Sequence, residues 1–127
     1  MTPIRFSNKL IFVEATVRAN GHSIVLKNVM VDTGSGGTIF STDQMEILGI
    51  SQELSDRIVF LRGIGGREAV IQKTVDEIRV GDLVVSPMRI QMGAIDYGFP
   101  LDGVLGLDFL LSTKAIIDFS SLDVRKG

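Results

Sequence analysis

One segment of the sequence stands out: Val29-Met30-Val31-Asp32-Thr33-Gly34-Ser35-Gly36. Its apolar residues run directly into a carboxylate, a hydroxyl and a glycine-rich turn. A carboxylate at the end of a buried strand is costly unless it is hydrogen-bonded or paired. Thr33 and the backbone amides of the turn are able to supply such hydrogen bonds. The segment is equally compatible with an ordinary strand-ending turn, because Asp, Thr, Gly and Ser all favour turns.

The residues before this segment predict a β-hairpin. From Leu10 to Ala19 apolar residues occupy alternate positions, which is typical of a half-buried strand. Asn20-Gly21 follows, a strong hairpin signal because both residues tolerate positive φ. In the return strand, Ser23–Val31, the apolar parity changes near Lys27-Asn28, which indicates a β-bulge at that point.

The rest of the chain predicts further short strands and two short helices. Ser41 and Gln44 form a capping-box pattern, so a helix is expected from Ser41 to about Gly49, and a second at Leu107–Ser112. The strands are expected at residues 38–40, Arg57–Leu61, Ala69–Ile71, Glu77–Val80, Leu83–Val85, Met88–Met92, Ala115–Phe119 and Leu122–Arg125. The whole chain, residues 1–127, is therefore predicted to be one mainly-β domain with one or two short helices.

Composition excludes several classes of protein. Fifteen acidic against 13 basic residues give a net charge of −2, which argues against a nucleic-acid binder. The sequence has no cysteine and one histidine, so neither a metal site nor a cofactor is expected. No apolar run reaches the roughly 18 residues of a spanning helix, so no membrane segment is expected in this chain. The absence of a visible secretory signal and of cysteine favours a cytoplasmic location, or the soluble part of a longer protein.

Two later segments complete a recognisable pattern. Gly63-Ile64-Gly65-Gly66 forms the tip of a predicted hairpin, and Leu101-Asp102-Gly103-Val104-Leu105-Gly106 runs into the second helix. With Asp32-Thr33-Gly34, these segments resemble the retropepsin-like (retroviral-type) aspartic proteases in order and spacing from about Leu10 to Val124. The resemblance implies a closed β-barrel of the acid-protease type, with a glycine-tipped flap at residues 63–66.

The resemblance also implies an activity and its residues. It assigns peptide-bond hydrolysis to Asp32, with Thr33 and Gly34 completing the catalytic motif. An extended polypeptide would bind as an added strand with apolar residues flanking the cut. Substrate binding is assigned to Ser35, Gly63, Ile64, Gly65, Gly66, Leu101 and Val104.

A homodimer follows from the motif count. The chain contains a single Asp-Thr-Gly and no Asp-Ser-Gly, so the second carboxylate has to come from another copy of the chain. Thr33 is expected to hydrogen-bond across the two-fold axis. In this family the chain ends often interleave into an interface sheet, for which Pro3–Phe6 and Leu122–Arg125 are the candidates.

The sequence departs from the viral pattern in two places. Ser35-Gly36-Gly37 replaces Ala-Asp-Asp after the first motif, and Gly106-Leu107-Asp108 replaces Gly-Arg-Asn in the third. An acid and an arginine that would pair between these segments are both missing, which indicates cellular or bacterial relatives and a weak dimer. The remaining acids are interpreted as solvated or capping residues; they include Asp43, Glu46, Asp96 and Asp108.

Two other functions stay open. A non-catalytic dimeric β module that binds extended peptides would have nearly the same sequence, because fold does not determine function. One half of an actin-like ATPase also has a strand that runs into an Asp-x-Gly-Ser-Gly pattern, although such a protein needs a much longer chain. Cleavage assays on an Asp32→Asn variant and nucleotide-dependent thermal stabilisation separate these possibilities.

Overall fold

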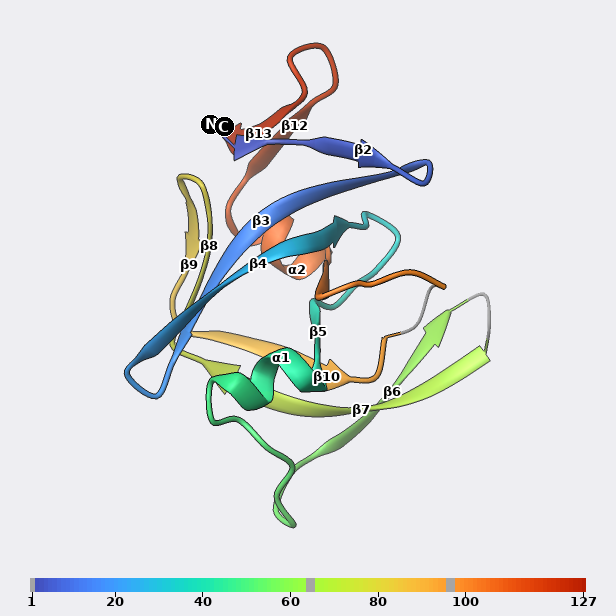
Figure 1. Cartoon of the computed structure of the whole chain (residues 1–127), viewed down its shortest axis with the longest axis vertical. Coiled ribbons are helices and arrows are strands. Elements are labelled where there is room, and N and C mark those ends of the chain that lie inside the picture. The colour runs from blue at the N-terminus through green and yellow to red at the C-terminus, as the bar shows by residue number, and fades with distance from the viewer. Residues whose placement is uncertain (1, 64–65, 96–97) are drawn as a thin grey trace.

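The fold is built almost entirely from short strands (Figure 1). The computed structural model describes residues 2–63, 66–95 and 98–127. Its helices are α1 (Thr42–Ile47) and α2 (Leu107–Ser112). Its strands are β1 (Thr2–Pro3), β2 (Arg5–Ser7), β3 (Leu10–Ala19), β4 (His22–Val31), β5 (Ile39–Ser41), β6 (Ile58–Gly63), β7 (Gly66–Val75), β8 (Glu77–Val80), β9 (Leu83–Val85), β10 (Met88–Gly93), β11 (Gly103–Leu105), β12 (Ala115–Asp118) and β13 (Asp123–Lys126). The predicted mainly-β domain with two short helices is confirmed.

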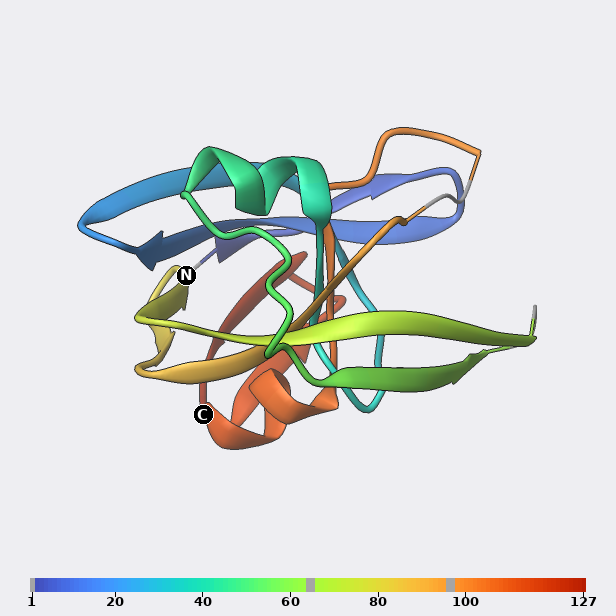
Figure 2. The same ribbon diagram turned by 90° about the horizontal axis from the view of Figure 1, so that it is seen from below.

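Most strands belong to one ten-stranded sheet. Its order is β6-β7-β10-β5-β11-β4-β3-β8-β9, with β2 paired to β3 beside this path. The expectation of a closed barrel needs correction, because no ladder among the described residues joins β6 to β9. The path ends at β6 on one side and at the three-residue β9 on the other, and β3 pairs with both β2 and β8 along one of its edges. Figure 2 shows the β3–β4 and β6–β7 hairpins as separate layers.

The β3–β4 hairpin contains the predicted bulge. Val13 pairs with Val29 and Ala15 pairs with Leu26, so Lys27 and Asn28 stand opposite the single residue Glu14. This extra residue changes the parity of β4, so that Leu26 before it and Val29 after it both face the core. The bulge therefore lets one strand stay apolar on its inner face up to Asp32.

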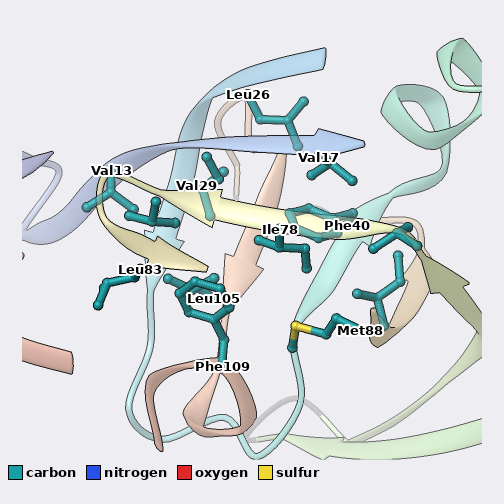
Figure 3. Close-up of a cluster of buried hydrophobic side chains, with 14 of the residues drawn as sticks. Val13, Val17, Leu26, Val29, Phe40, Ile78, Leu83, Met88, Leu105 and Phe109 are labelled. Atoms are coloured by element: carbon teal, nitrogen blue, oxygen red, sulfur yellow. The ribbon is translucent and has the colours of Figure 1, made fainter. Parts of the chain in front are cut away.

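A single large core lies between the layers (Figure 3). Phe40 from β5, Leu105 from β11 and Phe109 from α2 are fully buried there. Figure 3 shows them packed among Val13, Val17, Leu26, Val29, Ile78, Leu83 and Met88. Each such side chain contributes roughly 1.5–3 kcal/mol when it leaves water. Because β4, β5 and β11 all contribute to this core, it holds in place the strands that flank the Asp32 turn.

The two chain ends pair with each other. β1, β13 and β12 form a separate three-stranded sheet, in which β1 near the start of the chain pairs with β13 near its end (Figure 1). Ile4 N–H also donates to the Leu122 carbonyl at 2.9 Å. Both edges of β13 are occupied within one chain, by β1 and β12. An interleaved interface sheet would therefore require β1 to leave its own β13.

The β6–β7 hairpin extends from the body of the molecule (Figure 2). It runs as a regular antiparallel ladder from Ile58↔Ile71 to Gly63↔Gly66, which confirms the predicted hairpin. Ile64 and Gly65, the predicted flap tip, lie outside the described residues. β7 is longer than the sequence predicts because it pairs with β6 on one side and β10 on the other.

Candidate active site

The Asp32 turn sits where two strands separate. β11 lies between β4, with which it is parallel, and β5, with which it is antiparallel. Leu105 is in register with Val31, the last residue of β4. The chain leaves β4 at Asp32, loops outward, and returns through β5 on the other side of β11 (Figure 1). The apolar strand that ends in a carboxylate is thus clamped against a second apolar strand.

The Asp32 carboxylate is half-buried and oriented by its own turn. Asp32 N–H donates to the Leu105 carbonyl at 3.0 Å, and Ser35 N–H donates to the Asp32 carbonyl at 3.1 Å. Gly34 N–H donates to Asp32 Oδ1 at 2.9 Å. A Cβ on residue 34 would lie 3.1 Å from the same oxygen, so glycine allows this close approach. The carboxylate is held in one orientation beside the exposed residues Thr33 and Gly34.

Ser35 holds the loop together. Its hydroxyl donates to the Gly37 carbonyl at 2.8 Å, and its own carbonyl accepts the Leu107 N–H at 2.8 Å. Gly106 packs against the same loop so tightly that a Cβ there would lie 2.7 Å from the Gly37 carbonyl carbon and oxygen. The predicted substrate contact of Ser35 stays a prediction, and the structure adds a role within the turn.

The predicted apolar pocket residues are covered within one chain. Leu101 and Val104 are 7% and 1% exposed and form a small second cluster with Phe12 and Met30. Val104 is in register with Met30, two residues before Asp32 on β4. The cluster therefore lies beside β4, the strand that leads into Asp32, and the substrate-binding role of Leu101 and Val104 stays a prediction.

Sequence reasoning missed two residues of this site, Thr38 and Asp108. Thr38 N–H donates to Asp108 Oδ2 at 3.0 Å, and the Thr38 hydroxyl donates to Asp108 Oδ1 at 2.7 Å. Asp108 was expected to be solvated or capping. It does accept the Phe109 N–H of its own helix at 2.8 Å, but it also joins α2 to the Asp32 loop. The signal in the sequence was the position of Asp108, two residues after Gly106, where the viral pattern has an Asn.

Within residues 2–63, 66–95 and 98–127, no three His, Cys, Asp or Glu side chains are grouped so as to hold a metal ion. In the same part of the chain, no helix has both the length and the apolar character required to cross a bilayer.

Comparison with known proteins identifies the family. A family model described as aspartyl protease matches residues 13–109. Among solved structures, the chain is similar to a retropepsin-like aspartic protease from Rickettsia conorii. The two are 19% identical, with a TM-score of 0.60, over 94% of this chain and 83% of that one. A search of curated protein sequences finds no significant match. On the strength of the match across residues 13–109, this chain belongs to the aspartyl protease family, and its fold is retropepsin-like.

Proposed function

We propose that this protein is an aspartic endopeptidase whose active form is a homodimer with one Asp32 from each copy in the catalytic pair. The observation that carries the proposal is the Asp32 turn itself. A half-buried carboxylate is held at the end of an apolar strand, with Gly34 N–H on one oxygen and exposed residues beside it. Each chain supplies one such motif, so pairing two carboxylates requires two chains.

The paired carboxylates perform acid–base catalysis on a bound water. Like charges at hydrogen-bond distance do not both ionise, so the pair shares one proton. The ionised carboxylate removes a proton from the water, whose oxygen attacks the peptide carbonyl carbon, while the protonated carboxyl polarises the carbonyl oxygen. The C–N bond then breaks, the nitrogen leaves as an amine after taking up a proton, and the carbonyl carbon becomes a carboxylic acid.

The second copy has to approach the end of β4. Phe6 on β2 pairs with Ile11, the neighbour of Phe12, and Phe12 pairs with Met30 on the catalytic strand. Phe6 is 67% exposed and lies on a strand that pairs only with β3 among the described strands. An exposed aromatic side chain on β2, two strands from β4, supports a dimer surface that includes this strand. The proposed dimer surface therefore contains the Asp32 turn and Phe6.

The substrate is a polypeptide bound in extended form between the β6–β7 hairpin and the Asp32 turn. Main-chain hydrogen bonds hold an added strand, and its alternate side chains enter pockets on either side. The apolar cluster of Leu101 and Val104 beside the catalytic strand supports a preference for apolar residues next to the cut.

The first test compares wild type with Asp32→Asn and Asp43→Asn on an unfolded apolar protein. Asp43 is an exposed acid of α1 and serves as the matched control. Losing the general base should lower the cleavage rate roughly 100- to 10,000-fold in Asp32→Asn, and leave it unchanged in Asp43→Asn. Equal rates in all three proteins would contradict the catalytic role of Asp32, and no cleavage by any of them would favour the alternative, a dimeric module that binds peptides without cutting them.

The dimer and the shared proton have their own tests. Sedimentation equilibrium should show a monomer–dimer equilibrium that Phe6→Asp shifts toward monomer, while Leu54→Asp, at a fully exposed loop position, does not.

Activity should peak at or below neutral pH, since it falls once both carboxylates ionise, and statine-like peptides should inhibit. A strictly monomeric active enzyme, or a rate still rising at pH 9, contradicts the proposal.

A further inference from the structure

Thr38 is the most completely bonded residue beside the catalytic loop. It is fully buried, yet its side chain is polar. Its hydroxyl donates to Asp108 Oδ1 at 2.7 Å and accepts the Gly106 N–H at 3.1 Å. Its backbone N–H donates to Asp108 Oδ2 at 3.0 Å, and its carbonyl accepts the Gln91 N–H at 3.0 Å. One residue thereby joins the Asp32 loop to β10, to the end of β11 and to α2.

The partner of Thr38 has to be a carboxylate. Asp108 Oδ1 accepts both the Thr38 hydroxyl and the Phe109 N–H, and Oδ2 accepts the Thr38 N–H. Each oxygen thus faces a backbone N–H that can only donate. An asparagine amide would have to turn its NH₂ group toward one of these donors, which leaves a half-buried polar group unsatisfied.

These bonds continue to the catalytic carboxylate. Two backbone hydrogen bonds attach the Asp32 turn to residues 105–107. Asp32 N–H donates to the Leu105 carbonyl at 3.0 Å, and Leu107 N–H donates to the Ser35 carbonyl at 2.8 Å. The Thr38–Asp108 pair closes the same frame, three residues beyond Ser35 on one segment and one residue beyond Leu107 on the other. The loop from Asp32 to Thr38 is therefore fastened to residues 105–108 at its start, its middle and its end.

We propose that Thr38 and Asp108 are positioning residues, which act through this frame to hold the Asp32 carboxylate in place for the reaction. The catalytic part of this inference depends on the proposed endopeptidase function, whereas the effect on the turn is measurable without it. A small displacement of a reacting group slows the reaction, and a loss of roughly 100-fold in rate for about 1 Å is typical.

The test uses Thr38→Val, Thr38→Ser and Asp108→Asn, with Thr113→Val as the matched control. Thr113 is also a buried threonine, and its hydroxyl bonds to the Phe109 and Leu110 carbonyls inside α2 rather than to the loop. Each protein is examined for kcat and KM per dimer and for amide exchange at Gly34, Ser35 and Leu107.

Thr38→Val and Asp108→Asn should lower kcat roughly 100-fold with little change in KM, and should speed amide exchange in the Asp32 turn. Thr38→Ser should restore both properties, and Thr113→Val should leave both near wild type. The inference is overturned if Thr38→Val keeps wild-type kcat and exchange, if Thr38→Ser is as impaired as Thr38→Val, or if Thr113→Val is equally impaired.

Failure of the proposed function gives a different result. In that case Asp32→Asn cleaves as fast as wild type, and the exchange rates of Gly34 and Ser35 alone decide the inference. Faster exchange in Thr38→Val than in Thr113→Val supports the frame around the turn, and equal exchange refutes it.

Discussion

Two neighbouring arms of the fold, β4 with the Asp32 turn and β11 with the start of α2, have the same local pattern but different hydrogen-bond partners for their aspartates. β4 and β11 run parallel, and each apolar strand leads into a short segment containing a glycine and an aspartate. The first aspartate, Asp32, accepts the Gly34 N–H of its own turn. The second, Asp108, accepts three hydrogen bonds, two of them from Thr38. Two of the three donors to Asp108 therefore lie 70 residues away, whereas the donor to Asp32 lies in its own turn.

The largest difference in the free energy of unfolding should appear between substitutions at two adjacent residues of β11. Leu105 is fully buried in the main core, and Val104 is buried in the small second cluster. Leu105→Ala should cost ~2–5 kcal/mol in the free energy of unfolding. Val104→Ala should cost less, at roughly 0.8 kcal/mol for each lost methyl group, and should raise KM for apolar peptides. Urea denaturation and steady-state kinetics check both, and an unchanged KM in Val104→Ala would remove Val104 from the substrate site.

The Asp32 loop and the segment after β11 are in such close contact that a methyl group added at Gly106 should lower both stability and activity. A Cβ there meets backbone atoms of Gly37 at 2.7 Å and of Ser35 at 2.9 Å, so the loop has to shift. Gly106→Ala should cost ~1–3 kcal/mol and most of the activity. Gly36→Ala is the control, because a Cβ at that position meets nothing within 4 Å. Equal stability and activity of the two variants would show that the arms do not hold each other.

The two carboxylates themselves should separate stability from activity. Asp108→Asn leaves donors unsatisfied and should lower the free energy of unfolding by ~1–3 kcal/mol. Asp32→Asn should change it by less than about 0.5 kcal/mol, while it removes the activity. Denaturation of both variants at neutral pH is the measurement. A larger loss of stability in Asp32→Asn than in Asp108→Asn would reverse the comparison.

The smallest effect is expected in the chain-end sheet, where the half-buried Asp118 also accepts hydrogen bonds from several donors. The backbone N–H of Ser121, the Arg125 guanidinium and the Ser120 N–H lower the pKa of Asp118 to about 2. Arg125 also bonds to Asp123, at 2.7 Å. Because the folded pKa lies below the ordinary value of 3.8, the stabilisation by Asp118 is complete above pH 3.8 and is lost as the pH falls toward 2.

Asp118→Asn should therefore be slightly less stable than wild type at pH 7, and the two proteins should converge near pH 2. Thermal unfolding across this range, with Asp82→Asn in the exposed β8–β9 turn as control, measures the difference. A constant difference from pH 7 to pH 2 would show that ionisation of Asp118 is not the cause.

Local patterns were sufficient to predict most of the elements. β3, β8, β9 and α2 have the predicted bounds, and Ser41 caps α1 by accepting the Gln44 N–H at 3.2 Å. These features depend on alternation, turn residues and capping, all of which act within a few residues. The Asp32 motif belongs to the same class, since its turn bonds join residues two or three positions apart.

What the amino-acid sequence determined by itself is the set of short strands, the two helices, and one Asp-Thr-Gly per chain at the end of an apolar strand. Only the tertiary structure decided that the sheet stays open, that β1 pairs with β13 of the same chain, and that Asp108 bonds to Thr38, 70 residues away. The reason is that long-range hydrogen bonds depend on which strands pack side by side. The same two residue types, Asp and Thr, therefore form a candidate catalytic motif at 32–33 and a hydrogen-bonded pair between distant segments at 38 and 108.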